Sequence, residues 1–381
     1  MTIEEELLQE YEKKLLDLYA RANTKSKKKK IVYDLFNFAS ICYDFFGIDK
    51  TYEWDYDPEM ISLLEDIALP FADNIIEDRE DYLEITNSVI NTFIETKYNF
   101  YKDHGIKVYS LSPYEIQQLT FDFLNHYDED LLKRYREKIL NQELFDISMI
   151  TQTGFAGATY PMQGLKKSLI FCDDTINSLF GAATFMHELG HSDEYETKAK
   201  CGYSDYATIS SKSPYQEVSS RFLEYAFLKY LQENKIYTND TKITLRYYYT
   251  SMLEHLYCAN LICKTPFINI NRQGFTEIND ACIASYARTL QEGLNYYDMP
   301  SELGEQINFR NSFIYGIGSL FSIYLYEKYK EEPKYFKKEF RNTLINYPYT
   351  NIEAFENVGV TKEKIVEGKI LKKIIKDIGE Q

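Results

Sequence analysis

Two histidines and a glutamate stand at the spacing of a catalytic metal site in the segment His187-Glu188-Leu189-Gly190-His191. Residues four apart lie on one face of a helix, so both imidazoles can reach one Zn2+ ion at about 2.0–2.1 Å. Glu188 follows the first histidine and can reach the open position where such an ion binds water. The segment therefore predicts zinc bound by His187 and His191, with Glu188 deprotonating the water. The alternative is a helix with two incidental histidines.

The third metal ligand must come from elsewhere, because no further histidine follows at the short metzincin spacing. A second helix is predicted to open at Pro214, with Ser213 as its N-cap and Glu217 in its first turn. Glu224 follows two turns later on the same face. Acids are seldom fully buried unless they are paired or metal-bound. One of these two could therefore ligate zinc while the other orients a ligand histidine, unless both face solvent.

The segments before residue 150 are predicted to be helices, from their apolar periodicity. They cover residues 2–21, 31–47, 78–103 and 113–142, the last as one or two helices. At about residue 150 the amino-acid composition changes. Residues 151–164 are rich in glycine and other small residues and cannot form a stable helix. We therefore expect a helical N-terminal lobe over residues 1–150 and a catalytic region over residues 151–381.

A short strand is predicted at residues 166–171, between the glycine-rich stretch and the histidine helix. An extended peptide can add to an exposed strand, so this stretch could be a substrate-binding edge or an ordinary connector. Further helices are expected over residues 177–195, 242–263, 313–331, 337–345 and 362–378. The predicted fold class is mainly α with a small sheet.

The formal net charge of −16 argues against nucleic acid as a partner, because an acidic surface repels phosphate. The one basic run, KSKKKK at residues 25–30, is interpreted as a solvated helix junction in preference to a nucleic-acid or lipid patch. The six cysteines are scattered, without a CxxC pair, as in reduced proteins. No apolar run approaches the roughly 20 residues of a membrane span, and no apolar leader opens the chain, so a cytoplasmic location is expected.

These motifs resemble the M3 family of metallopeptidases, most closely its oligoendopeptidase F branch. The resemblance rests on HELGH (187–191) and QEVSSRFLE (216–224), with GFAGATYP upstream and SFIYGIGSLFSIYLYEKY downstream, and covers roughly residues 150–381. It implies that Glu217 is the third ligand and Glu224 the supporting acid. It also implies a two-lobed helical metallopeptidase with a deep cleft, a small sheet beside the active-site helix, and one zinc ion per chain.

In this family a late segment carries a histidine and tyrosines that bind and polarise the scissile carbonyl. Tyr315 best fits the transition-state tyrosine, which would donate a hydrogen bond to the developing oxyanion; the alternative is a core aromatic. No histidine follows His255, and Asn308 or a neighbour stands about where the family histidine is expected. The N-terminal part is also shorter than is usual in the family. Substrate range and rate are therefore less well predicted than the metal site.

The first hypothesis from the sequence is a zinc endopeptidase that cleaves short peptides. The second is a related helical exopeptidase of the carboxypeptidase kind, which end-blocked peptides would distinguish. The third is a catalytically weak protein that captures peptides in a metal-dependent way. Zinc is preferred over other divalent ions from the ligand types alone. The sequence does not indicate an oligomeric state.

Overall fold

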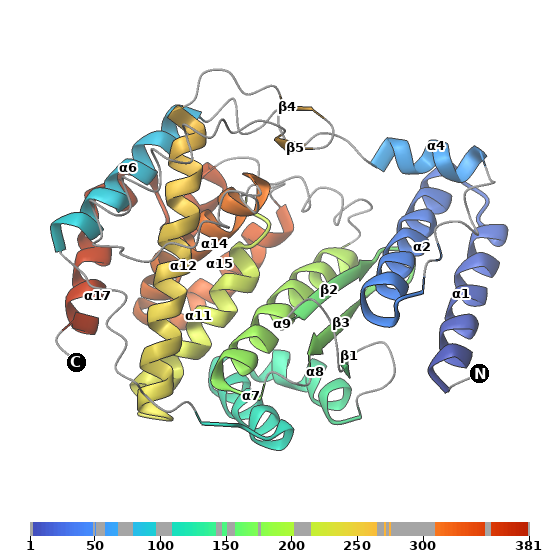
Figure 1. The fold of residues 1–381 in the computed structure, drawn as a ribbon, viewed down its shortest axis with the longest axis horizontal. Coiled ribbons are helices and arrows are strands. Elements are labelled where there is room, and N and C mark those ends of the chain that lie inside the picture. Colours follow the sequence, from blue (N-terminus) through green and yellow to red (C-terminus); the bar gives the residue numbers. More distant parts are fainter. Residues whose placement is uncertain are drawn as a thin grey trace. The chain divides into compact units, whose positions relative to one another are not determined.

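The computed structural model describes residues 3–48, 50, 58–67, 79–96, 109–141, 147–150, 157–173, 177–201, 215–264, 270–271, 274–275, 309–346 and 352–379. Helices dominate this part of the chain, as predicted (Figure 1). The chain divides into two compact units: Met1–Leu69 with Ser110–Ser211, and Pro70–Tyr109 with Lys212–Gln381. The histidine helix belongs to the first of these units, and the division into a lobe over residues 1–150 and a catalytic region over residues 151–381 stays a prediction.

The first unit is built around a three-stranded sheet in the order β1-β3-β2. Strand β3 pairs in parallel with β1 and antiparallel with β2, which leaves β2 at an edge. The elements of this unit are α1 (Ile3–Arg21), α2 (Lys25–Phe46), α4 (Pro58–Ile67), α7 (Pro113–Tyr127), α8 (Glu129–Asn141), β1 (Ile147–Ile150), β2 (Gly157–Met162), β3 (Lys167–Asp173) and α9 (Leu179–Lys200).

The two faces of this sheet meet different helices because side chains alternate along a strand. Leu169 and Phe171 of β3 join Met162 of β2 in a core cluster with residues of α1, α2 and α4. Ser168, directly before Leu169 in β3, points the other way and hydrogen-bonds Ser192 of α9. The histidine helix α9 therefore lies against one face of the sheet, and the N-terminal helices cover the other.

The lysine run lies inside α2, which starts at Lys25, six residues before the predicted helix. Thr24 is the N-cap, and its hydroxyl accepts a hydrogen bond from the backbone N–H of Lys27. The repulsion between neighbouring lysines is partly offset by Glu59 of α4, whose carboxylate lies 2.6 Å from Lys28. The interpretation as a helix junction is thus corrected to the first turns of a helix, which are still largely solvated.

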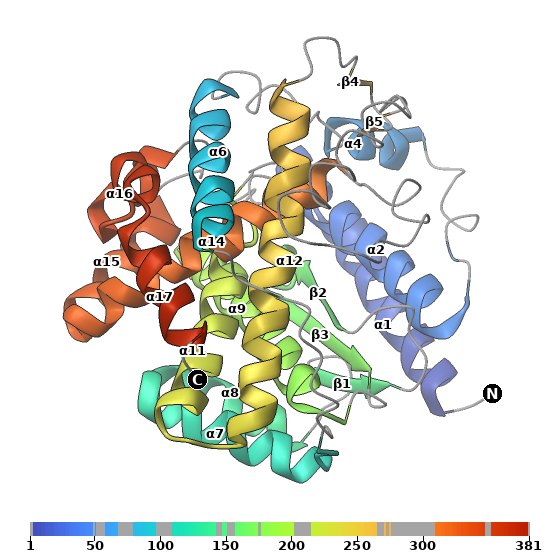
Figure 2. The same ribbon diagram turned by 60° about the vertical axis from the view of Figure 1, so that its left-hand side comes forward.

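The second unit is a helical bundle in which α12 packs against α6 and α14, and α14 also packs against α11 (Figure 2). Its aromatic core includes Phe222, Phe336 and Phe340. The elements are α6 (Arg79–Thr96), α11 (Val218–Glu233), α12 (Thr238–Lys264), β4 (Ile270–Asn271), β5 (Gly274–Phe275), α14 (Phe309–Glu331), α15 (Pro333–Asn346), η2 (Ile352–Val358), α16 (Lys362–Glu367) and α17 (Lys369–Gly379).

Several predicted helices of this unit differ in their limits from the structure, and two of these differences have a visible structural cause. The helix expected from Pro214 begins at Val218, after a turn at residues 215–217. Tyr215 is fully buried against Phe321 and Phe355, and Tyr82 donates a hydrogen bond to its hydroxyl, so tertiary packing holds this turn out of the helix. The closing helix is two helices, because Gly368 adopts a left-handed conformation between α16 and α17.

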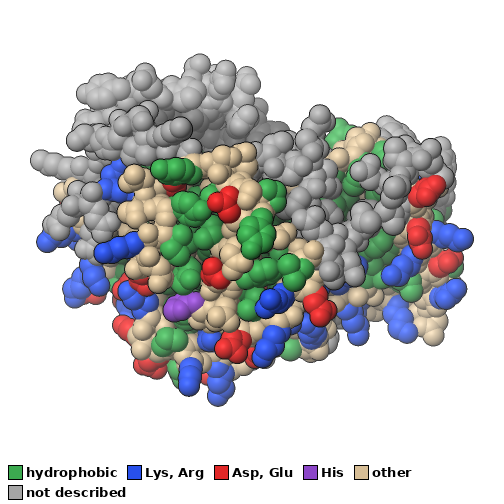
Figure 3. Space-filling model, turned by 90° about the horizontal axis from the view of Figure 1, so that it is seen from below, with side chains coloured by type: hydrophobic (Ala, Val, Ile, Leu, Met, Phe, Trp, Pro, Cys, Tyr) green, Lys and Arg blue, Asp and Glu red, His purple; other side chains and the backbone are tan. Residues whose placement is uncertain are grey.

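None of the described helices combines the length and the apolar character that crossing a lipid bilayer requires. On the face shown in Figure 3, acidic and basic side chains are interspersed with apolar ones and do not form a large area of one sign. Among the described side chains of this face, the acidic residues therefore do not gather into a single surface.

Candidate metal centre

The histidine motif lies in the middle of α9, where it is buried on all sides. The helix begins after Ser178, whose hydroxyl caps it by accepting from the backbone N–H of Gly181. His187, Glu188 and His191 are only 7%, 5% and 8% exposed. The two imidazole rings are neighbours in an edge-to-face arrangement, with centroids 4.8 Å apart and planes at 83°. This is the relationship that the i, i+4 spacing predicts for two ligands of one ion.

The second half of α9 is fixed to its neighbours by polar contacts. Ser192 hydrogen-bonds the hydroxyls of Tyr135 and Ser168, at 2.7 and 2.6 Å. Asp193 forms an ion pair with Arg134 at 2.6 Å, and Glu196 forms one with Lys138 at 2.7 Å. Helix α8 and strand β3 thus hold α9 in place, which fixes the direction of the two imidazoles.

Glu188 is in contact with the edge strand β2. The Thr159 hydroxyl donates a hydrogen bond to Glu188 Oε2 over 2.6 Å and also lies 3.1 Å from the Glu188 backbone oxygen. Gly157, two residues earlier on the same face of the strand, leaves the space that the glutamate side chain occupies. A Cβ at position 157 would stand 2.9 Å from Glu188 Cγ. The candidate base is therefore held between its own helix and β2.

Glu217 is buried in the second unit, at 4% exposure, and forms the N-cap of α11 without capping it through its side chain. The Ser220 hydroxyl lies 3.0 Å from Glu217 Oε2 and an equal distance from its backbone oxygen. Gln216 donates a longer hydrogen bond, 3.4 Å, to Oε1. The carboxylate is thus retained in a buried position by neighbouring donors, and the interpretation of Glu217 as a solvent-facing acid is wrong.

Glu224 is likewise buried, and it pairs with Arg221 over 2.9 Å. Burial alone would lower the pKa of the Arg221 guanidinium, but the Glu224 carboxylate, together with Tyr248, Tyr315 and Glu217, outweighs this and raises the pKa. The guanidinium lies over the ring of Tyr315, 4.9 Å from its centroid. His255 stacks on the same ring at 5.5 Å, and burial together with Arg221 lowers the pKa of His255 to about 4. Tyr315 therefore sits beside a fixed cation and a neutral imidazole.

His187, His191 and Glu217 form a buried group that could hold one metal ion, since each offers one ligand atom. Two imidazoles and one carboxylate are a donor set that suits Zn2+, and three protein ligands leave a coordination position for water. The donor set therefore fits the predicted ion. Pro214, Ser213 and Asn308 lie outside the described residues, and the roles of Tyr315 and Glu224 stay predictions.

Sequence reasoning assigned no role to several residues that contact the predicted ones, among them Gly157, Thr159 and Arg221. The alternation of Gly157 and Thr159 at i and i+2 indicates one shared strand face, but the sequence does not say which helix that face meets. Arg221 stands three residues before Glu224, at the spacing of a helical ion pair, and this signal could have been read.

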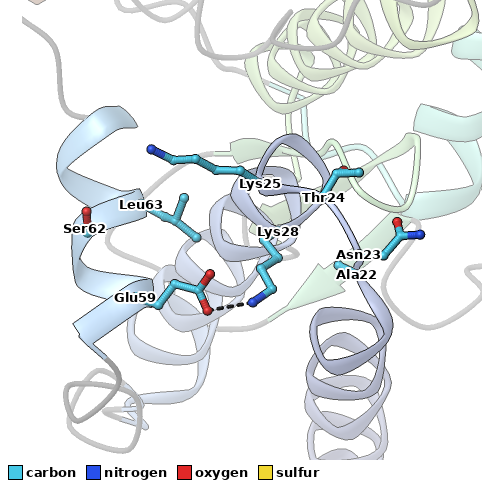
Figure 4. A pocket seen from close by; sticks show the side chains of 8 residues that line it. All are labelled: Ala22, Asn23, Thr24, Lys25, Lys28, Glu59, Ser62 and Leu63. Carbon is cyan, nitrogen blue, oxygen red and sulfur yellow. Dashed lines mark hydrogen bonds and ion pairs between the residues drawn. The ribbon is translucent and has the colours of Figure 1, made fainter.

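A separate pocket of the first unit lies between the junction of α1 and α2 and helix α4 (Figure 4). Its lining residues are Ala22, Asn23, Thr24, Lys25, Lys28, Glu59, Ser62 and Leu63. This set contains no histidine or cysteine, and Lys28 is directed at Glu59, with which it forms an ion pair. The pocket is therefore not a second candidate for the metal centre.

No protein-family model matches the sequence, and no curated protein matches it. Two solved structures share its fold. A provisionally named peptidase from Chlamydophila abortus aligns with a TM-score of 0.57, at 12% identity over 92% of this chain. A provisionally named oligoendopeptidase F aligns with a TM-score of 0.52, at 10% identity over 98% of this chain. The alignments cover 62% and 66% of those two chains, so this chain spans less than two thirds of either.

Proposed function

We propose that this chain is a zinc-dependent peptidase that hydrolyses short peptides. The observation that carries the proposal is the buried group of His187, His191 and Glu217, with Glu188 adjacent in the sequence to the first ligand. Two of the three ligands would come from α9, and the third would be the residue directly before α11. When bound, zinc would supply Lewis acidity that polarises the scissile carbonyl and acidifies water.

Glu188 would act first as a base and then as an acid. It would take a proton from the attacking water, whose hydroxide adds to the carbonyl carbon. The same proton would then pass to the nitrogen of the leaving amine as the C–N bond breaks. The Tyr315 phenol would donate a hydrogen bond to the oxyanion that develops on the carbonyl oxygen. Arg221 and His255, which both lie against the Tyr315 ring, would restrict where that ring can point.

Two observations support peptides as the substrate class. The structures that share this fold carry peptidase names. In addition, among the described strands β2 pairs only with β3, so its other edge could accept a further strand, except at Pro161, whose backbone oxygen accepts a hydrogen bond from Asn37. An extended peptide can pair with such an edge, which would bring its backbone alongside Glu188.

The test combines metal content with peptide hydrolysis. Purified protein is expected to contain one zinc ion per chain and to cleave a library of quenched fluorescent peptides. A chelator should remove both the metal and the activity, and added zinc should restore them. Glu188→Gln should keep the zinc and lose turnover, because the amide cannot take the proton from water.

Two outcomes would contradict the proposal: turnover that survives complete metal removal, or a normal rate in a clean Glu188→Gln sample. Peptides with blocked ends distinguish the mode of cleavage. An endopeptidase cleaves them as fast as free peptides, whereas an exopeptidase loses the substrate when its terminus is blocked. Metal-dependent binding of peptides without any cleavage would favour the capture protein over the enzyme.

A further inference from the structure

The two oxygens of the Glu188 carboxylate have different surroundings. Oε2 accepts a hydrogen bond from the Thr159 hydroxyl over 2.6 Å, a length typical of a hydroxyl on a charged carboxylate. Among the described residues, Oε1 has no hydrogen-bonding partner. It faces Gly157, where an added Cβ would stand 3.2 Å from it. Oε2 is thus hydrogen-bonded to β2, and Oε1 is left available for a further hydrogen bond.

We infer that Thr159 is a positioning residue that fixes Glu188 through Oε2 and assigns the proton transfer to Oε1. This inference rests on the proposed role of Glu188 as the base. A glutamate side chain has three rotatable bonds, and most of its rotamers would turn the carboxylate away from a given point. The hydrogen bond to Thr159 selects one of them before a substrate arrives, which is how a preorganised site gains rate.

The strand provides this anchor because two residues of one face act together. Gly157 and Thr159 both face α9, and β2 is held in register by its pairing with β3 from Gly157 to Met162. On the opposite face, Tyr160 packs against the rings of Phe45 and Phe171. The strand is therefore fixed from behind while its other face contacts the base. Gly157 leaves space for the Glu188 side chain, and the Thr159 hydroxyl orients its carboxylate.

The test compares Thr159→Val with Thr159→Ser. Valine keeps the β-branched shape that suits a strand and removes only the hydroxyl, whereas serine keeps the hydroxyl. Thr120→Val is the matched control, because Thr120 is a buried threonine of α7 in the same unit whose hydroxyl bonds only its own helix, at Ile116 O. If the valine variant does not fold, Thr159→Ala removes the same hydroxyl without added bulk.

The readouts are kcat, KM, zinc content and melting temperature. Thr159→Val is expected to lower kcat by about 10- to 100-fold, the effect of losing a hydrogen bond to a charged group. KM should change by less than about threefold, and one zinc should remain bound, since the variant does not touch a ligand. Thr159→Ser should restore most of kcat, and Thr120→Val should keep it.

An unchanged kcat in Thr159→Val would overturn the inference, as would a serine variant as slow as the valine variant. An equal loss in Thr120→Val would do the same, because it would mean that kcat follows general packing. These results are distinct from a failure of the proposed function. If Glu188→Gln is active or the metal is dispensable, the function fails. If Glu188→Gln is inactive and Thr159→Val is fully active, only the inference fails.

Discussion

Gly318 of α14 lies so close to Glu217 that a Cβ at position 318 would stand 2.8 Å from the Cβ of Glu217 and 2.9 Å from its carbonyl carbon and oxygen. Separations this short involve backbone atoms, which cannot turn aside as a long side chain can. The close approach of α14 to the N-terminus of α11 therefore depends on a residue without a side chain at this position. The candidate ligand Glu217 is in turn held by that approach.

Gly318→Ala is predicted to destabilise the protein and to weaken zinc binding. In an open helix position, alanine in place of glycine stabilises by about 1 kcal/mol. Here the clash with Glu217 should reverse the sign and cost about 1–3 kcal/mol. Urea unfolding of the metal-free protein measures the stability, and zinc titration measures the affinity. A more stable variant with unchanged zinc affinity would show that α14 and α11 can accommodate the added methyl group.

Glu217→Gln is predicted to lower zinc affinity by at least about 100-fold, more than the 10- to 100-fold typical of residues that only support a ligand. The amide keeps the size of the carboxylate and loses its charge, so the metal-free fold should change little. Competition with a chromophoric chelator measures the affinity. Glu188→Gln serves as the control, since it makes the same exchange on a residue that is not a predicted ligand and should retain zinc. Equal affinities in the two variants would remove Glu217 from the ligand set.

The helical period alone predicted that residues 187 and 191 share one face of a helix, and their ring centroids lie 4.8 Å apart. The sequence also predicted the helical class and most helices of the described part. The start of α11 was predicted wrongly, since Ser213 and Pro214 form a favourable local start signal, whereas Tyr215 is buried by aromatic rings of α14 and η2. Local preference gives way there to packing between distant segments.

The surroundings of the site could not be predicted for a related reason. Thr159 and Glu188 are 29 residues apart, and their contact depends on which sheet face α9 covers. Gly318 and Glu217 are further apart still, and only the packing of α14 on α11 brings them together. A single sequence carries the residue types of such pairs but not the pairing itself. The charge of a residue was also a weak guide to its solvent exposure, because Glu224 is paired with Arg221 inside the bundle.

Removing one partner of the Arg221–Glu224 pair is predicted to destabilise the fold strongly. Replacing both partners together is predicted to destabilise it much less. Glu224→Met alone should destabilise the protein by about 3 kcal/mol, because it leaves a buried guanidinium without its carboxylate. The double variant Arg221→Met with Glu224→Met should cost clearly less than the sum of the two single variants. Chemical unfolding of the four proteins in this cycle gives the coupling energy.

The matched control for this cycle is the pair of Lys330 and Glu233, which has a similar distance of 2.8 Å but is about half exposed. Glu233→Met should cost less than about 1 kcal/mol, as is usual for a pair at the surface. Similar costs at the two sites would mean that burial does not strengthen the first pair. Activity in the double variant also tests whether Arg221 restricts Tyr315, because the ring contact is lost with the guanidinium.

Asp34 is predicted to make the stability of the fold fall as the pH rises. Its side chain is wholly buried in α2, and burial raises the pKa of the carboxyl well above its usual value, although backbone donors at Leu165, Gly164 and Gln163 oppose the shift. In the folded state the group keeps its proton to a higher pH than in the unfolded chain. The unfolded state therefore binds fewer protons between the two pKa values, and the free energy of unfolding declines across that interval.

Asp34→Asn should remove this decline. The amide cannot ionise, so the stability of the variant relative to the wild type should increase from pH 4 to pH 8. The expected increase is about 1–3 kcal/mol, the usual cost of a buried polar group whose hydrogen bonds are not all made. Asp17→Asn is the control, because it makes the same exchange on an exposed residue of α1. Urea unfolding at several pH values measures the difference. Parallel curves for the wild type and Asp34→Asn would mean that the Asp34 carboxyl titrates alike in the folded and unfolded chain.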